Sequence, residues 1–134
     1  MLTMGERSLS RQQSLSTISV SVSGALNGEL VLQNVSFCGI VNDKYDLDTL
    51  TTLDGVKYAF SIFGSYHGPD TYNTGPNTGL WVQISNGNGN WWTNTTGGSG
   101  QVTINSDGQS GTVSSTLAGV ATNTSVHVEG SWTC

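Results

Sequence analysis

The chain has 134 residues and a mass of 14.1 kDa, a size that suits one domain rather than two. Only 10% of its residues are charged, and its polar content comes instead from Ser, Thr, Asn and Gly, which together number 64. These residues are poor helix formers, so the composition argues against a long helix or a coiled coil. The net charge of −5 argues against nucleic acid as a partner, and no apolar run reaches the roughly 18 residues that a transmembrane segment needs.

The first half of the chain alternates apolar and polar residues in a way that predicts β-strands. Apolar residues occupy every second position from Ile18 to Val22, with serines between them. The residues after position 30 are apolar on both faces, as in a central strand. Asn27-Gly28 is typical of a type I′ hairpin turn. The expected elements are strands at 18–23, 30–37 and 56–62, a hairpin turn at 27–28, an acidic loop at 42–54 and a turn at 54–55.

The second half contains more turn residues between shorter alternating runs. Gly, Pro and Asn punctuate residues 64–79, which we expect to form a long loop. Trp91 and Trp92 begin a strand after an Asn- and Gly-rich turn, and adjacent side chains on a strand point to opposite faces. The remaining expected elements are strands at 80–85, 101–105, 111–117 and 125–132, with a hairpin turn at 107–108.

These elements define the expected fold class. About eight or nine short strands with turns between them are typical of a β-sandwich or a small barrel. We expect an all-β, antiparallel β-sandwich that forms a single domain over residues 15–134, after a flexible leader at residues 1–14. On the final strand, Val126, Val128 and Trp132 should face the core, and His127 should face solvent.

Cys38 and Cys134 are the only cysteines. Two thiols and two histidines suit no structural zinc site, and no basic residue lies beside either cysteine to activate it. A disulfide between them is the simplest account, and closing a loop of about a hundred residues would stabilise the fold by about 4–5 kcal/mol. It implies an oxidising compartment, so we expect a secreted or cell-surface protein. Three N-x-S/T sequons, at Asn34, Asn94 and Asn123, are candidate glycosylation sites, although chance explains them in so Asn-rich a chain.

The acidic residues suggest an ion rather than catalysis. The motifs G-x-S-x-G, H-E-x-x-H, C-x-x-C and the P-loop do not occur, and we expect no enzymatic activity. Asp43, Asp46 and Asp48, with Asn42 beside them, offer the oxygen ligands that Ca²⁺ prefers. The alternatives are a structural calcium site and a solvated acidic loop, and we expect no other cofactor.

Aromatic residues beside amides indicate a carbohydrate as one candidate ligand. Sugars are recognised by flat aromatic faces with polar groups around them. Trp91 and Trp92 lie beside Asn90, and Tyr66 and Tyr72 lie in the expected long loop. The alternative for the outward-facing tryptophan is a structural role, in which it covers a sheet edge or packs under the loop.

The scarcity of charge in the C-terminal part suggests self-assembly. Residues 58–134 carry only Asp70, Asp107 and Glu129 as charged side chains. Exposed edge strands are normally protected by charge, so a β surface without it favours strand addition between copies. Residues 16–23 are the candidate donor strand, and the alternative is that they pair within their own domain.

Three short segments carry a resemblance to a known family. The segments YHGPDTY (66–72), VTINSDGQSGTV (102–113) and VHVEGSWTC (126–134) occur in an order that resembles small secreted or surface β-sandwich proteins of actinobacteria and relatives, of the mycobacterial 19-kDa lipoprotein-antigen type. The resemblance covers residues 36–134 and implies an exported, non-enzymatic surface protein with a disulfide from its last strand to an early one. The chain departs from the family at Phe37, which stands where a lipobox requires a small residue before the cysteine.

Together these patterns predict an extracellular or cell-surface protein that acts by binding or by self-assembly as a structural subunit. A carbohydrate-binding module that uses the exposed Trp and Tyr residues is the alternative.

Overall fold

The computed structural model describes residues 16–134, and within them the chain forms nine β-strands that pair antiparallel throughout. The expected leader, residues 1–14, lies outside the described residues. The nine antiparallel strands confirm the predicted all-β antiparallel fold class. The strands are β1 (Thr17–Gly24), β2 (Gly28–Val41), β3 (Lys44–Leu53), β4 (Val56–Ser65), β5 (Asp70–Thr74), β6 (Leu80–Ser85), β7 (Trp91–Ile104), β8 (Ser110–Gly119) and β9 (Ser125–Thr133).

The strands close into a barrel, so the sandwich prediction is wrong on this point. The hydrogen-bonded order is β7-β6-β4-β3-β2-β1-β9-β8, and β8 pairs back onto β7, which makes a ring of eight strands. The ninth strand, β5, lies along the second half of β7, where its residues 70–74 pair with 100–104. Closure removes the two free edges that each sheet of a sandwich has, except along residues 31–41 of β2, which within residues 16–134 pair with β3 alone.

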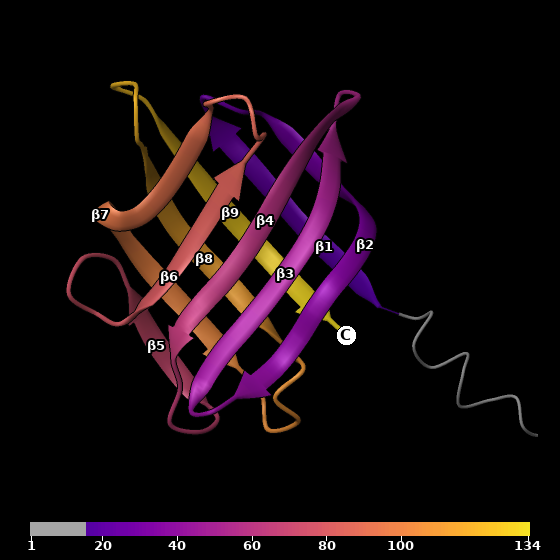
Figure 1. Cartoon of the computed structure of the whole chain (residues 1–134), viewed down its shortest axis with the longest axis vertical. Coiled ribbons are helices and arrows are strands. Elements are labelled where there is room, and N and C mark those ends of the chain that lie inside the picture. The colour runs from indigo at the N-terminus through magenta and orange to yellow at the C-terminus, as the bar shows by residue number, and fades with distance from the viewer. Residues whose placement is uncertain (1–15) are drawn as a thin grey trace, which may run out of the picture.

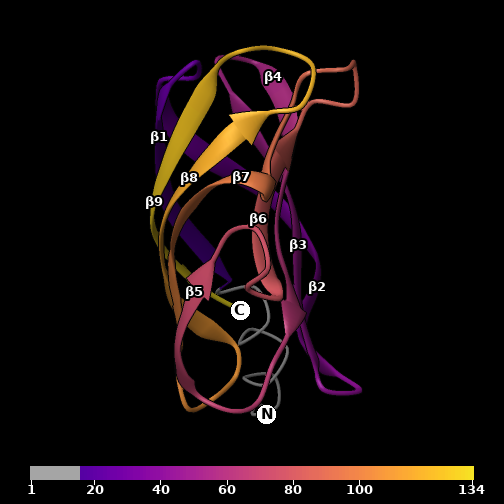
Figure 2. The same ribbon diagram turned by 90° about the vertical axis from the view of Figure 1, so that its left-hand side faces the viewer.

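The barrel is flattened into two layers, which is the part of the sandwich prediction that holds (Figures 1 and 2). β3, β4 and β6 lie in one layer, β1, β8 and β9 lie in the other, and the strands of the two layers cross steeply (Figure 1). β2 and β7 are the corners, because each pairs with strands of both layers. Register shifts at Leu32/Asn34 and Val35/Phe37 in β2, and at Thr93/Gly98 in β7, supply the bends that such corners need.

Two residues build the corner in β7. Asn94 is fully buried, and its Oδ1 accepts the backbone N–H of Val82 at 2.9 Å, so an amide side chain replaces a ladder partner where the strand bends. Gly98 has a φ of 82°, and a Cβ at this position would lie 2.1 Å from the carbonyl oxygen of Thr116. Only glycine permits both this conformation and this close approach.

Buried apolar side chains fill the interior of the barrel. Trp132, Tyr45 and Phe60 are the largest of the fully buried side chains. The indole Nε1–H of Trp132 donates to the Tyr45 hydroxyl at 3.2 Å, and burial raises the pKa of that hydroxyl to about 12. Val126 and Val128 are buried and His127 lies on the opposite face, as predicted.

Two expected loops contain strands instead. Residues 44–53 form β3, in which Tyr45, Leu47 and Leu53 are buried while the acidic residues between them point outward, so the acids mark one face of a strand. The turns lie on either side of it, at Asn42-Asp43 with φ of 51° and 64° and at Asp54-Gly55 with φ of 51° and 81°. These positive angles are those of type I′ turns.

The remaining turns also differ from the predictions in detail. The expected loop at 64–79 contains β5. The hairpin at Asn27-Gly28 is confirmed, but its turn is longer than a type I′ turn, and the Asn27 side chain holds it by hydrogen bonds to the backbone N–H and carbonyl of Gly24. The hairpin at 107–108 is confirmed, with Val102 opposite Val113.

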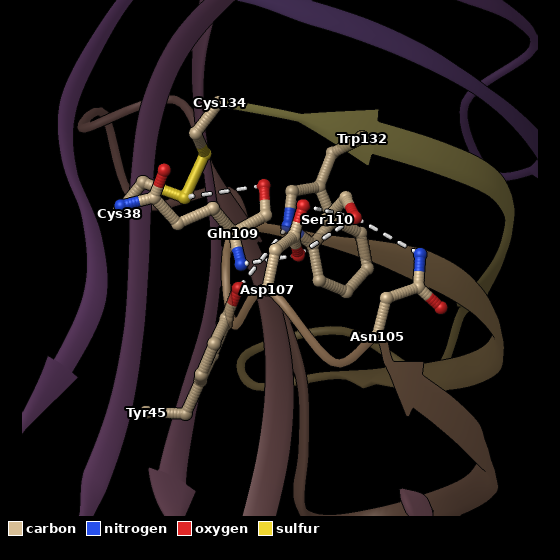
Figure 3. The surroundings of a disulfide bond; sticks show 8 residues. All are labelled: Cys38, Tyr45, Asn105, Asp107, Gln109, Ser110, Trp132 and Cys134. Carbon is tan, nitrogen blue, oxygen red and sulfur yellow. Dashed lines mark hydrogen bonds between the residues drawn. A yellow bond between two sulfur atoms is a disulfide. The ribbon is translucent and has the colours of Figure 1, made fainter. Parts of the chain in front are cut away.

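The predicted disulfide is confirmed (Figure 3). Cys38 of β2 and Cys134, directly after β9, have Cα atoms 6.4 Å apart. The β7–β8 turn supports the bond, because the backbone N–H of Cys134 donates to the Gln109 carbonyl at 2.8 Å. Asp107 accepts the backbone N–H of Gln109 at 2.9 Å, and this hydrogen bond lowers the pKa of the Asp107 carboxyl. The described residues hold no helix that could span a membrane.

Candidate ligand-binding groove

A groove of about 490 Å³ runs across the outer face of β3, β4 and β6. Its volume lies within the range of small-molecule sites. The strand register places its main side chains in two rows, because residues paired across neighbouring strands share a face. The rows are Asp46, Phe63 and Trp81, and then Asp48, Ser61 and Gln83.

The period of two within each strand explains why these side chains face outward. In β6, Leu80, Val82 and Ile84 are buried in the barrel, so Trp81 and Gln83 must point away from it. The same alternation turns Asp46 and Asp48 outward from β3. The groove is therefore a product of strand register, and no single segment of sequence contains it.

The ring of Trp81 is held in place from two sides. Its indole Nε1–H donates to the carbonyl oxygen of Gly75 at 3.0 Å. Its ring centroid lies 5.8 Å from that of Phe63, with the two planes tilted by 50°. Because the polar edge of the indole is already hydrogen bonded, its partly exposed face is a fixed, flat, apolar surface.

Asp46 and Asp48 form a pair beside this surface. Burial raises the pKa of the Asp46 carboxyl to about 6, and a hydrogen bond to Asp48 and the repulsion between the two charges act in the same direction. Asp46 therefore holds a proton more readily than an isolated aspartate, and the two carboxyl groups together offer several hydrogen-bond acceptors.

Three other polar side chains line the groove. Among the hydrogen bonds of residues 16–134, none involves the side chain of Gln83, Ser61 or Lys44. Gln83 and Ser61 are partly buried, so a ligand that hydrogen bonds to them would recover an interaction that burial has weakened. Lys44 is exposed at the edge of the groove.

The tryptophans nominated from the sequence have different environments. Trp92 is only 6% exposed, and its Nε1–H donates to the Thr124 hydroxyl at 3.1 Å. Trp91 is 42% exposed, which confirms that the two side chains point to opposite faces. Asn90 is exposed just before them, in a turn where its backbone N–H donates to the Asn86 side chain at 3.3 Å.

The nominated tyrosines lie elsewhere. Tyr72 of β5 is buried and stacks on Tyr66, with ring centroids 6.0 Å apart, and Tyr66 in turn contacts Tyr45 at 5.7 Å. The Tyr72 hydroxyl accepts the backbone N–H of His67 at 2.9 Å. β5 lies at the end of the barrel opposite the start of β7 (Figure 1), so the tyrosines form a structural cluster away from Trp91.

The three aspartates predicted as calcium ligands also lie in different parts of the structure. Asp46 and Asp48 lie in the groove, whereas Asp43 lies in the turn before β3. Within the described part of the chain, no three or more His, Cys, Asp or Glu side chains are grouped as metal ligands would be. Calcium stays a prediction from the sequence.

The three sequons differ in access. Asn34 on β2 and Asn123 in the β8–β9 loop are exposed. Asn94 is fully buried and bonded to Val82, so it cannot accept a glycan in the folded protein.

Sequence reasoning missed Trp81, Phe63 and Gln83. The available signal was the alternation in residues 80–85, where an aromatic and an amide share the outward face of a strand whose other face is fully apolar.

The chain thus belongs structurally to the closed antiparallel β-barrels, with a mixed aromatic and carboxylate groove on one layer. It matches no protein-family model, no curated protein and no solved structure. The resemblance to small actinobacterial surface proteins therefore stays a prediction from sequence motifs.

Proposed function

We propose that this protein is a non-enzymatic, extracellular carbohydrate-binding module and that the groove on β3, β4 and β6 is its binding site. The observation that carries the proposal is the immobilised, partly exposed Trp81 ring next to paired carboxylates and an unpartnered amide. An aromatic face stacks on the C–H groups of a sugar ring, while carboxylates and amides bind its hydroxyls.

The charges of the groove favour neutral sugars. Asp46 and Asp48 would repel a uronic or sialic acid, and among residues 16–134 Lys44 is the only cation lining the groove. The net charge of −5 on the whole molecule also disfavours an anionic ligand. Neutral hexoses or N-acetylhexosamines are thus the favoured class.

The geometry favours binding without hydrolysis. Glycosidases separate their two carboxyl groups by at least about 5 Å, so that a sugar or a water molecule fits between them. Asp46 and Asp48 instead lie two residues apart on one face of β3, close enough for Asp48 to raise the pKa of the Asp46 carboxyl. The disulfide supports an oxidising, extracellular location for such a module.

Calorimetric titration with neutral oligosaccharides tests the proposal. The probes are the cello-, manno- and chito-oligosaccharide series, with oligogalacturonides as the anionic comparison. We expect at least one neutral series to bind and Trp81→Ala to weaken it about tenfold, which is the scale of one aromatic stacking contact plus its buried area. Trp81→Phe should retain most of the affinity.

Two further variants make the result specific. Gln83→Ala should weaken binding without affecting the barrel, because the side chain faces outward. Trp91→Ala, tested with a disaccharide, is the matched control for loss of a tryptophan outside the groove. If no neutral oligosaccharide binds, or if Trp81→Ala and Gln83→Ala bind as the unmodified protein does, the proposal fails.

Self-assembly is a second candidate, but the strand expected to mediate it is already paired. The predicted donor, residues 16–23, falls mainly in β1, which pairs with β9 along its whole length and with β2 at Val20–Val22. A different strand offers an edge. Among the described residues, positions 31–41 of β2 pair with β3 alone, and Val31, Phe37 and Val41 there are at least 40% exposed. Such an edge can pair with another copy.

Light scattering tests this second candidate. Assembly through β2 predicts multimers that dissociate when Phe37 is replaced by Lys, because a charge protects an edge from pairing. A Val120→Lys variant is the control, since Val120 is at least as exposed as Phe37 but lies in the β8–β9 loop. A chain that stays monomeric at high concentration would remove this candidate.

A further inference from the structure

A second exposed tryptophan lies on the same outer face as the groove. Trp91 pairs with Ser85 across β6 and β7, and Ser85 points outward like Trp81 and Gln83 in the same strand. Trp91 is therefore an outward side chain one strand beyond Trp81 and four residues further along. At ~3.3 Å per residue and ~4.8 Å per strand, the two Cα atoms are about 14 Å apart.

The surface between the two tryptophans carries small and polar side chains. Along β6 the interval contains Gln83 and Ser85, and Thr93 of β7 pairs with Gln83. Ser61 and Ala59 of β4 flank the same two residues on the side of β6 away from Trp91. Small and hydrogen-bonding side chains make a floor on which an elongated ligand can lie. A single hexose ring on Trp81 would not reach Trp91.

Trp91 is held by its backbone. It pairs with Ser85 on one side, and its carbonyl oxygen accepts the N–H of Val120 at 2.9 Å on the other. The turn before it is ordered by Asn86, whose side chain accepts the backbone N–H groups of Asn88 and Asn90. The exposed indole is thus presented from a fixed position, which lowers the entropy cost of binding.

We infer that Trp91 forms a second sugar subsite and that the ligand is an extended neutral glycan chain, bound along its length from Trp81 past Gln83 and Ser85 to Trp91. This inference rests on the proposed function and adds the chain length of the ligand to it. Recognition along a chain differs from recognition of a terminal sugar, because affinity then increases until the ligand spans both aromatic rings.

The test is calorimetric titration of oligosaccharides of increasing length, from disaccharide to hexasaccharide, in the neutral series that binds. We expect Trp91→Ala to leave disaccharide affinity unchanged and to weaken hexasaccharide binding about tenfold, equivalent to about 1.4 kcal/mol. Trp91→Phe should restore most of the loss. Trp81→Ala should weaken binding at every length.

The outcomes separate the inference from the function on which it rests. If Trp81→Ala weakens hexasaccharide binding and Trp91→Ala does not, the binding module stands and the second subsite is wrong. If affinity is the same for a disaccharide and a hexasaccharide, the extended ligand is wrong. If no oligosaccharide binds, both proposals fall. The far-ultraviolet spectrum of each variant verifies that the barrel is intact.

Discussion

Removing the disulfide should weaken the barrel chiefly through the unfolded chain. Cys38 and Cys134 are 96 positions apart, and closing a loop of that length lowers the entropy of the unfolded state by an amount worth about 4.7 kcal/mol at 25 °C. The native ladders do not depend on the bond, because β2 pairs with β3, and β9 pairs with β1 and β8 along its length. The double variant Cys38→Ala/Cys134→Ala should therefore fold to the same barrel and be about 4–5 kcal/mol less stable.

Urea unfolding followed by tryptophan fluorescence measures this difference. The variant should also show a larger m-value, because its unfolded chain exposes more surface once the cross-link is absent. The unmodified protein in the presence of a reductant is the matched sample and should follow the variant. A loss below about 1 kcal/mol with an unchanged m-value would show that loop closure does not stabilise this fold.

Three further changes test the β7 corner and the groove. Gly98→Ala should lower the free energy of unfolding by roughly 2–4 kcal/mol, and its control Gly87→Ala by only about 1 kcal/mol. Both glycines have positive φ (82° and 78°), but only at Gly98 would a Cβ meet a backbone oxygen. Equal losses of stability in urea unfolding would contradict this reasoning. Asn94→Ala should cost about 1–3 kcal/mol by leaving the buried N–H of Val82 without its acceptor, and mass spectrometry of the protein from a glycosylating host should find Asn94 unmodified. The pKa of Asp46 is raised to about 6 from 3.8, so the folded state binds this proton more tightly than the unfolded state does. Stability therefore falls as pH rises from about 4 to about 6, and the loss is complete above that interval. Asp46→Asn should recover on the order of 1 kcal/mol at neutral pH after allowance for solvent screening, and a stability difference from the unmodified protein that does not change with pH would contradict the assignment.

The strands that alternate strictly were predictable from the sequence. β1, β4, β6 and β9 show period-two patterns, and the buried positions of β9 are those that the pattern indicates. β3 was missed because its outward positions carry Asp46 and Asp48, and a high local charge resembles a loop. The pattern of Tyr45, Leu47 and Leu53 was the stronger signal, since burial decides the structure of a strand more than the charge on its solvent face does.

Closure of the barrel could not be predicted in this way. It depends on the bend in β7, where one buried amide and one glycine allow a single strand to pair with both layers. Pairing of β1 with β9 joins segments about a hundred residues apart, and no local pattern specifies it.

The candidate site, too, was predictable from the sequence only in part. The opposite orientations of Trp91 and Trp92 follow from adjacency on a strand, and the structure has them. The groove requires the relative register of three strands, which places Asp46 beside Phe63 and Trp81. Tyr66 and Tyr72 were plausible ligand contacts by composition, but their stacking contacts make them part of the fold.

The pairing of β1 with β9 also sets when the molecule can fold. Thr17–Gly24 finds its full-length partner only in residues 126–133, so the ring stays incomplete until those residues have left the ribosome. At a synthesis rate of about 5–20 residues per second, β1 remains without this partner strand for about 5–20 s. The serines that alternate with its apolar residues keep one face of the waiting segment hydrophilic, which protects a nascent chain from aggregation before its last partner arrives.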